Sequence, residues 1–187
     1  MGSNNDISLK ALAKINLGLD VVRRREDGYH EVRMIMQTIH LYDRLDIKRT
    51  KEPGIQIQTN LSFLPVNENN LIYKAAKLLM DEFSITDGVS VKLDKRIPVA
   101  AGMAGGSTDA AAMLIGVNRL FSLGLTKRQL MERGVQIGAD VPYCIMRGTA
   151  LAEGIGEALS PLPPMVKCPV LIAKPSISVS TKFVYRI

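Results

Sequence analysis

The sequence predicts an α+β fold because its strand-like and helix-like segments are grouped along the chain. Alternating apolar residues indicate strands in much of residues 9–58, apolar helical patterns occupy 69–83 and 107–121, and strand-like segments return within 143–173. Strands that cluster early and late, with helices between them, are typical of a sheet whose helices pack on one face. We find no repeat, low-complexity stretch or internal linker in the sequence.

Length and composition are those of an ordinary soluble globular protein. The 187 residues are enough for one buried core or two small lobes, and 47% of them are hydrophobic and 22% charged. The net charge of +6 suits anionic partners, but the charges are dispersed and Arg23–Arg25 is the one tight run. With no Trp and no aromatic residues interleaved with basic ones, we expect no nucleic-acid partner.

Cysteine usage and the start of the chain predict a cytoplasmic protein. Cys144 and Cys168 lie in apolar surroundings without metal-ligand spacing, so we expect both to be reduced core residues. No apolar run reaches the length of a membrane-spanning helix, so no membrane partner is expected. The first apolar stretch carries several charges, which excludes a signal peptide, and we interpret residues 1–8 as a leader of the kind that cloning leaves.

The early strands place polar residues at two positions of interest. Residues 9–21 alternate, which puts Lys14 and Asn16 on the same face, two positions apart, either as a solvated strand face or as part of a site. After the turn at Asp27-Gly28, strands are expected at 29–41, 44–49 and 55–58. Tyr29 and His30 stand just past that turn, where they have a structural role or offer a ring stack and a hydrogen bond to a base.

The later elements follow from caps and apolar stripes. A helix is expected from Asn69 to Phe83, and a strand at 89–93 leads towards a glycine-rich stretch. A capping box at Thr126–Gln129 begins another helix that ends near Gly138. Strands are expected at 143–146, 149–153 and 168–173, with a rigid loop at 160–164.

The glycine-rich stretch Pro98–Ala112 is the feature most typical of a ligand site. Gly102, Gly105 and Gly106 allow positive φ and close approach to a ligand, and Ser107 is expected to cap a helix that runs to Phe121. A helix N-terminus behind a glycine loop suits an anion such as a nucleotide phosphate. The stretch is neither a P-loop nor a GxGxxG motif, and a glycine turn that packs a helix against a sheet is an equal alternative.

Charged residues around this stretch are further candidates. Asp109 would repel a phosphate unless a metal ion or another cation lay between them. Lys95 and Arg96, directly upstream, are either solvated charges or contacts to a nucleotide. Asp140 lies in an apolar segment where a carboxylate is costly unless paired, so it is either a functional group or a cap.

Pro-x-x-x-Gly-Met-Ala-Gly-Gly-Ser-Thr-Asp-Ala-Ala resembles the phosphate loop of the GHMP kinase superfamily, from which Met103 and Ala104 depart by replacing the usual Leu-Gly. Within it, the order and spacing of five further segments resemble the 4-diphosphocytidyl-2-C-methyl-D-erythritol kinases, from about residue 9 to the end of the chain. These segments are Ala13-Lys-Ile-Asn-Leu17, Asp27-Gly-Tyr-His30, Asn70-Leu-Ile72 with Lys74-Ala-Ala76, Gly138-Ala-Asp-Val-Pro142 and Ala152-Glu-Gly-Ile-Gly-Glu157.

This resemblance implies the ribosomal protein S5 domain 2-like fold of a GHMP kinase N-terminal domain. Residues 9–187 would form that ATP-binding domain and the start of a connection to a C-terminal domain, which family members have and this sequence lacks. The activity implied is ATP-dependent phosphorylation of the 2-hydroxyl of 4-diphosphocytidyl-2-C-methyl-D-erythritol in the non-mevalonate isoprenoid pathway, with Mg²⁺. Because the family's substrates lie between the two halves, the activity of this chain alone stays open, as does its oligomeric state.

The resemblance also assigns roles to residues. Asp140 would accept the hydroxyl proton, and Lys14 would keep Asp140 ionised and offset charge on the reacting oxygens. The residues implied for ATP are Asn70, Lys95, Pro98, Ala100, Gly102, Met103, Ala104, Gly105, Gly106, Ser107 and Thr108. Those implied for the small-molecule substrate are Asn16, Tyr29, His30, Thr181 and Tyr185, and no protein metal ligand is assigned.

Two alternatives remain at this level. One is another GHMP small-molecule kinase, of the homoserine or mevalonate type, which would not need the Gly-Tyr-His element at residues 28–30. The other is a non-catalytic nucleotide- or RNA-binding module of the same fold, which would bind RNA with steep salt dependence and transfer no phosphate.

Overall fold

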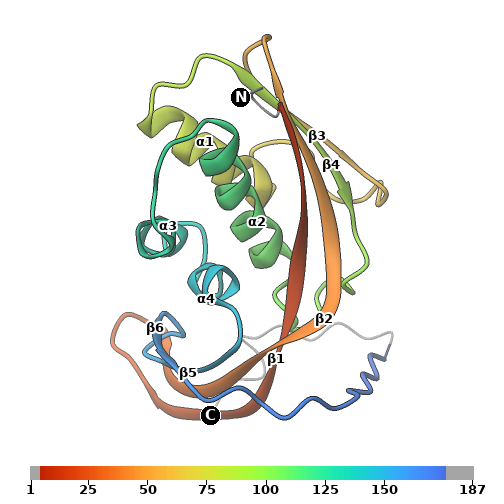
Figure 1. Ribbon diagram of the computed structural model, residues 1–187. Coiled ribbons are helices and arrows are strands. Elements are labelled where there is room, and N and C mark those ends of the chain that lie inside the picture. The colour runs from red at the N-terminus through yellow and green to blue at the C-terminus, as the bar shows by residue number, and fades with distance from the viewer. Residues whose placement is uncertain (1–4, 176–187) are drawn as a thin grey trace.

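A six-stranded sheet forms one layer of the molecule, and the helices cover one of its faces (Figure 1). The computed structural model describes residues 5–175. The strands are β1 (Asp6–Arg24), β2 (His30–Thr50), β3 (Ile55–Thr59), β4 (Gly88–Asp94), β5 (Thr149–Glu153) and β6 (Ala158–Pro161). The helices are α1 (Leu71–Glu82), α2 (Gly105–Leu120), α3 (Lys127–Gly134) and α4 (Val141–Met146). The predicted α+β class is confirmed.

Strand β2 organises the sheet. The order is β3-β4-β2-β5-β6, and β1 pairs along almost the whole of β2, with every pairing antiparallel except that of β3 with β4. Two expectations were wrong here. Strand β2 runs without the break expected at residues 42–43, because β1 and β4 pair with it on both sides of that point. Strand β1 begins at Asp6, so residues 6–8 belong to the sheet rather than to a leader.

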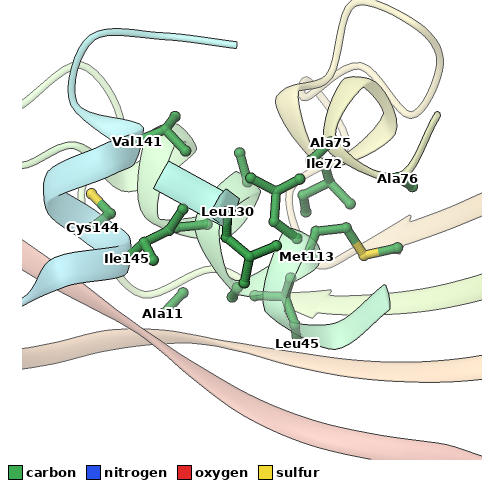
Figure 2. Close-up of a cluster of buried hydrophobic side chains, with 14 of the residues drawn as sticks. Ala11, Leu45, Ile72, Ala75, Ala76, Met113, Leu130, Val141, Cys144 and Ile145 are labelled. Carbon is green, nitrogen blue, oxygen red and sulfur yellow. The ribbon is translucent and has the colours of Figure 1, made fainter. Parts of the chain in front are cut away.

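Helix α2 lies at the centre of the core. Side chains from the sheet, from α1 and from α3 and α4 converge on it, and Figure 2 shows Met113 between Leu45 of β2 and Ile72 of α1. Its residues are buried nearly all round, as the sequence predicted. The helix is capped three residues earlier than expected, however. Its N-cap is Ala104, which makes no side-chain capping bond, and Ser107 lies within the first turn.

The C-terminal part of the described chain differs most from expectation. Residues 141–146, expected to contain a strand, form the short helix α4, because Pro142 is pre-organised for a first helical turn and the apolar face packs on α2 and α3. Residues 168–173 form no strand, and Cys168 is exposed rather than in the core, whereas Cys144 is buried as expected. None of the helices in residues 5–175 is long and apolar enough to cross a membrane.

Two smaller corrections concern helix ends and the last strand. The capping box predicted at Thr126 is present, with Gln129 returning the bond, but α3 ends at Gly134 rather than near Gly138. Part of the loop expected at 160–164 belongs to β6, which pairs with β5. Residues 135–140 therefore form a short connection between α3 and α4.

Candidate active site

A cavity of about 870 Å³ opens where the glycine-rich loop meets the start of β2 and the entry to α1. This volume lies within the range of small-molecule sites. Nearly all the described residues assigned to the site in the sequence line this one cavity. They are Lys14, Asn16, Tyr29, His30, Asn70, Lys95, Pro98, Ala100, Gly102, Met103, Ala104, Gly105, Gly106, Ser107 and Asp140. Thr181 and Tyr185 lie outside the described residues.

Lys14 and Asp140 meet at the wall of this cavity. The Lys14 Nζ atom lies 3.9 Å from Asp140 Oδ2, with the lysine side chain almost fully buried and the aspartate side chain 32% exposed. Asp140 occupies the N-cap position of α4, but its side chain makes no capping hydrogen bond, so the carboxylate is turned to the lysine rather than to the helix. The interpretation of Asp140 as a mere cap is therefore wrong.

A β-bulge turns Lys14 towards the cavity. The register of β1 against β2 shifts between Leu12 and Lys14, and as a result the neighbours Ala13 and Lys14 are both buried. The shift also frees two backbone groups. The Lys14 N–H donates to the Met103 carbonyl oxygen at 3.2 Å, and the Leu12 carbonyl accepts from the Thr108 hydroxyl at 2.8 Å. Lys14 is thus fixed to the loop and its strand to the helix behind it.

Asn16 holds the lysine from the other side. Lys14 Nζ donates to Asn16 Oδ1 at 3.2 Å, as the predicted same-face placement requires, and Asn16 Nδ2 lies 3.6 Å from the Met34 sulfur. Both side chains line the cavity. The ammonium group is therefore positioned by an amide and a carboxylate together.

The loop from Pro98 to Ala104 turns through three residues with positive φ: Ala100 at 55°, Gly102 at 68° and Ala104 at 56°. Gly102 supplies this conformation as expected, but Gly105 and Gly106 do not. They are small for another reason, because a Cβ on Gly105 would lie 3.1 Å from Lys95 Nζ and one on Gly106 would lie 3.3 Å from the Leu71 side chain. The loop is therefore close-packed against its surroundings.

Two assigned residues at the loop contribute less than expected. The Met103 side chain is buried in a small apolar cluster with Ala13, Ile39 and Ile97, so it anchors the loop and leaves only its backbone for a ligand. Thr108 does not line the cavity, because its hydroxyl is donated to Leu12 and its side chain is buried. The Thr108 hydroxyl is therefore engaged within the fold, and the assignment of Thr108 to ATP stays a prediction.

The start of α2 offers unpaired backbone donors to the cavity. The bond from Thr108 N–H to the Ala104 carbonyl is the first of the helix, so the amides of Gly105, Gly106 and Ser107 precede the helical ladder. Their dipoles and the helix field favour an anion at this point. With the glycine loop beside them, these donors fit the phosphate groups of a nucleotide.

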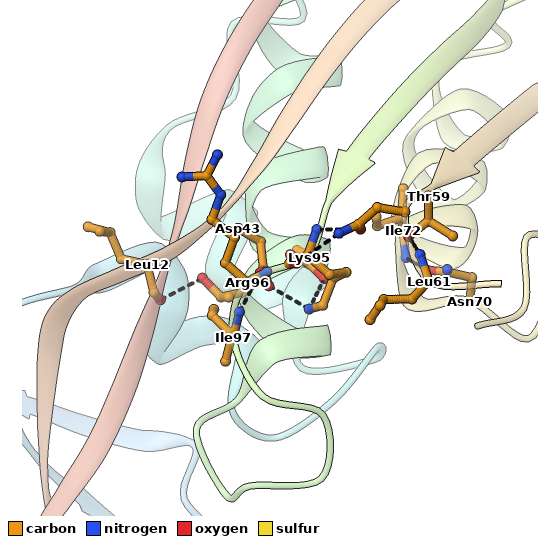
Figure 3. A network of polar contacts seen from close by, with 12 residues as sticks. Leu12, Asp43, Thr59, Leu61, Asn70, Ile72, Lys95, Arg96 and Ile97 are labelled. Carbon is orange, nitrogen blue, oxygen red and sulfur yellow. Dashed lines mark hydrogen bonds and ion pairs between the residues drawn. The ribbon is translucent and has the colours of Figure 1, made fainter. Parts of the chain in front are cut away.

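Beneath the loop, Lys95 joins two buried carboxylates (Figure 3). Lys95 Nζ lies 2.5 Å from Asp43 Oδ2 and 2.7 Å from Asp109 Oδ2. Asp43 Oδ1 accepts in addition from the backbone N–H groups of Arg96 and Ile97. Lys95 supplies the counter-charge that Asp109 was expected to need. One of its three N–H donors is used by Asp109 and a second by Asp43. Its role towards ATP stays a prediction.

The cluster perturbs the protonation of its members. Burial raises the pKa of Asp109 from its ordinary 3.8 to about 8, because Lys95 offsets only part of the lost hydration and Asp43 disfavours a second negative charge. Burial lowers the pKa of Lys95, but the two carboxylates outweigh it and hold that pKa above its ordinary value. Burial, together with the Asp140 carboxylate, raises the pKa of Cys144 to about 12, so this neighbouring thiol is no nucleophile at neutral pH.

The remaining assigned residues stand at the rim. Asn70 caps α1 by accepting from the Ile72 N–H at 2.9 Å and donates to the Pro65 carbonyl at 2.7 Å, so its polar atoms organise the cavity wall. Tyr29 is 61% exposed, which leaves its ring open to a partner.

Within residues 5–175 there is no group of three or more His, Cys, Asp or Glu side chains that could hold a metal ion.

Asp43 is the site residue that sequence reasoning missed. It occupies an inward position of β2, in step with the buried Leu45 and Ile47, so a carboxylate stood among core residues of an alternating strand. That position in the alternation was the signal that could have identified it.

Comparison with known proteins agrees with this geometry. Residues 70–148 match the family model of the GHMP kinases N terminal domain. A 4-diphosphocytidyl-2-C-methyl-D-erythritol kinase of Lachnoclostridium phytofermentans is 64% identical over 180 residues, which are 96% of this chain and 62% of the relative. One of Clostridium perfringens is 53% identical over 179 residues, with the same two coverages. The chain thus spans about three fifths of the length of these curated relatives.

Solved structures give the same result. A crystal structure of 4-(cytidine 5'-diphospho)-2C-methyl-D-erythritol kinase superposes with a TM-score of 0.81 at 37% identity, covering 96% of this chain and 63% of that one. A homoserine kinase from Cytophaga hutchinsonii has a TM-score of 0.69 at 18% identity, covering 98% of this chain and 60% of that one, which is a likeness of fold alone.

Proposed function

We propose that the chain carries the N-terminal domain of a GHMP kinase, and that its cavity binds ATP and transfers the γ-phosphoryl group to the 2-hydroxyl of 4-diphosphocytidyl-2-C-methyl-D-erythritol. The observation that carries this proposal is the approach of Lys14 Nζ to Asp140 Oδ2, 3.9 Å apart, in the cavity into which the first turn of α2 opens. A carboxylate, an ammonium and helical amides are groups that can orient an alcohol and stabilise the phosphates in phosphoryl transfer.

Asp140 acts as the general base in this proposal. Its partly exposed carboxylate can accept a hydrogen bond from a substrate hydroxyl, while Lys14 Nζ lies 3.9 Å from Asp140 Oδ2. The Lys14 ammonium also offsets the negative charge that develops on the attacking and transferred oxygens. Asn16 and the bulge of β1 keep Lys14 in place, so the charge is already oriented before the substrate arrives.

In this proposal the nucleotide binds where the first turn of α2 meets the cavity. The amides of Gly105, Gly106 and Ser107 would bind its phosphates, and the positive end of α2 would stabilise their charge. Bound ATP supplies the transferred phosphoryl group, and we propose that Mg²⁺ accompanies its phosphates. Magnesium commonly relies on substrate phosphates and a few carboxylates, so a dedicated cluster of protein ligands is not required.

The cytidine end of the substrate would lie at the rim. Tyr29 offers an exposed ring for stacking on the base, and His30 and Asn16 line the same cavity. Cys144 and Cys168 are both unpaired, which supports the cytoplasmic location that we propose.

An ADP-release assay tests the proposal. ATP and 4-diphosphocytidyl-2-C-methyl-D-erythritol are supplied to this chain and to a version extended to the full length of its relatives, with homoserine and mevalonate as competing acceptors. We expect ADP release from the extended version with the cytidylylated substrate and not with the other two. Absence of that turnover, or preference for another acceptor, would contradict the proposal. RNA binding that weakens steeply with salt, without any transfer, would favour a non-catalytic module.

A further inference from the structure

The buried cluster of Asp43, Lys95 and Asp109 joins the two ends of the glycine loop. The chain leaves the sheet after Asp94 at the end of β4, and it enters α2 at Gly105. On the sheet side, Asp43 accepts from the amides of Arg96 and Ile97 and from Lys95 Nζ. On the helix side, the same Nζ atom donates to Asp109 Oδ2 at 2.7 Å. Lys95 therefore bridges the segment before the loop and the first turns of the helix after it.

Asp109 is not expected to stabilise the folded protein. Two carboxyl groups share one ammonium group, and the Asp109 Oδ1 atom is buried without a hydrogen-bond partner. Asp109 is 3% exposed, so this atom loses hydration without compensation. Without the Asp109 carboxylate, Lys95 and Asp43 would remain as a balanced pair with the backbone bonds of Asp43 intact. A residue that is costly in the fold and lies beside the site calls for a functional reason.

We propose that Asp109 is a positioning residue for phosphate binding, which through Lys95 fixes the first turn of α2 against the sheet and so aims the amides of Gly105, Gly106 and Ser107. This inference rests on the proposed binding of ATP. Lys95 Nζ lies directly behind Gly105, since a Cβ added there would come within 3.1 Å of it. The ammonium group therefore lies next to the first residue of α2, where its position can influence the backbone that carries the donors.

The test compares phosphate-containing ligands with a ligand that lacks phosphate. Binding of ADP, inorganic tripolyphosphate and adenosine is measured by calorimetry or by ligand-observed NMR, on the parent chain and on Asp109→Ala. We expect Asp109→Ala to weaken ADP and tripolyphosphate on the order of tenfold and to leave adenosine unchanged, because only the amide donors are displaced. The midpoint of urea unfolding should stay equal or rise, because an unpartnered buried oxygen is removed.

Two further variants separate positioning from a general effect on the fold. Asp109→Asn keeps an oxygen that accepts from Lys95, so it should retain most of the phosphate affinity that Asp109→Ala loses. Asn118→Ala lies at the other end of α2, where it removes two hydrogen bonds to the Leu125 backbone. This control should lower stability and leave the affinity for all three ligands unchanged.

The outcomes are distinct. If the parent chain and its extended version bind neither ADP nor tripolyphosphate, the proposed function fails and the inference fails with it. If the parent binds ADP and Asp109→Ala binds it equally well or more tightly, the inference alone is wrong. If Asp109→Ala lowers stability and weakens adenosine in parallel with ADP, Asp109 is structural and the positioning role is also wrong.

Discussion

At the scale of single residues, the glycine loop carries a backbone cost at Ala104. This N-cap residue of α2 has φ 56° and ψ 31°, a left-handed conformation that costs an L-residue with a Cβ about 1–2 kcal/mol. The strained residue lies next to the amides that would bind phosphate. A rigid backbone there would keep these amides oriented towards the ligand.

Ala104→Gly is therefore expected to stabilise the protein. The gain should be about 0.5–1 kcal/mol, since relief of the left-handed strain exceeds the entropy that glycine loses on folding. Urea unfolding measures it, with Ala110→Gly in the right-handed interior of the same helix as the control, for which a loss of about 1 kcal/mol or more is expected. A loss of stability at both positions would show that Ala104 is not strained.

Asp109 makes stability depend on pH in a defined direction. Its pKa is about 8 in the folded protein and near 3.8 when unfolded, so between these values the folded state holds a proton that the unfolded state has released. The contribution of Asp109 is therefore fully present below about pH 4 and is lost as pH rises to about 8. The facing charged groups are Lys95 and Asp43, and both remain in the variant used below.

Asp109→Asn should remove this dependence. Unfolding free energies of the parent and Asp109→Asn are measured by urea titration between pH 5 and 9. The stability of the variant relative to the parent should grow as pH rises to about 8 and then level off. A difference that stays constant across this range would show that the Asp109 carboxyl ionises normally in the fold.

The sequence identified those site residues whose signal comes from neighbouring residues in the chain. Alternation placed Lys14 and Asn16 on one face, and an apolar segment marked Asp140 as costly, because both signals are read from neighbours in the chain. The bulge that buries Ala13 together with Lys14 could not be predicted, since it depends on the register of β1 against β2. Asp43 was missed because its partner Lys95 is brought to it only by the pairing of β2 with β4.

At the scale of elements, the contact of α2 with the bulge of β1 holds the loop in place. The Thr108 hydroxyl donates to the Leu12 carbonyl, and the Lys14 amide donates to the Met103 carbonyl. These two bonds connect the strand that carries the lysine with the helix and loop that would carry the phosphates. The site therefore depends on the docking of one helix on one strand.

Thr108→Val tests this contact. Valine keeps the shape and leaves the part-buried Leu12 carbonyl without its donor, which should cost about 1–3 kcal/mol in stability and weaken ADP binding. Thr108→Ser keeps the hydroxyl and should stay closer to the parent in both measurements. If Thr108→Val matches the parent in chemical denaturation and in ADP affinity, the hydroxyl bond does not hold the helix.

Elements with a strong local pattern were predicted, and those fixed by packing were not. The apolar sequence of α2 and the capping box of α3 specify their helices without further information. Residues 141–146 are apolar throughout, and a run this short fits a buried strand as well as a buried helix. Packing of this segment on α2 and α3 favours the helix. These contacts are between distant parts of the chain, so the local sequence does not predict them.

At the scale of the whole molecule, the site exists only in the complete fold of this domain. Lys14 comes from the first strand, the phosphate-facing amides come from the central helix, and Asp140 follows α3 near the end of the helical layer (Figure 1). The order of strands and helices predicted the α+β class because it reflects composition over long stretches. The meeting of Lys14 and Asp140 was expected from family resemblance, because no local pattern relates segments so far apart.

Replacement of Asp140 by Asn in the extended version tests the proposed kinase mechanism most directly. Steady-state ADP release with 4-diphosphocytidyl-2-C-methyl-D-erythritol is compared with ADP affinity measured on the same samples. General-base catalysis predicts that Asp140→Asn lowers kcat by about 10²–10⁴-fold while ADP affinity stays near that of the parent. Full turnover by Asp140→Asn would contradict the role of the Lys14–Asp140 pair and the function built on it.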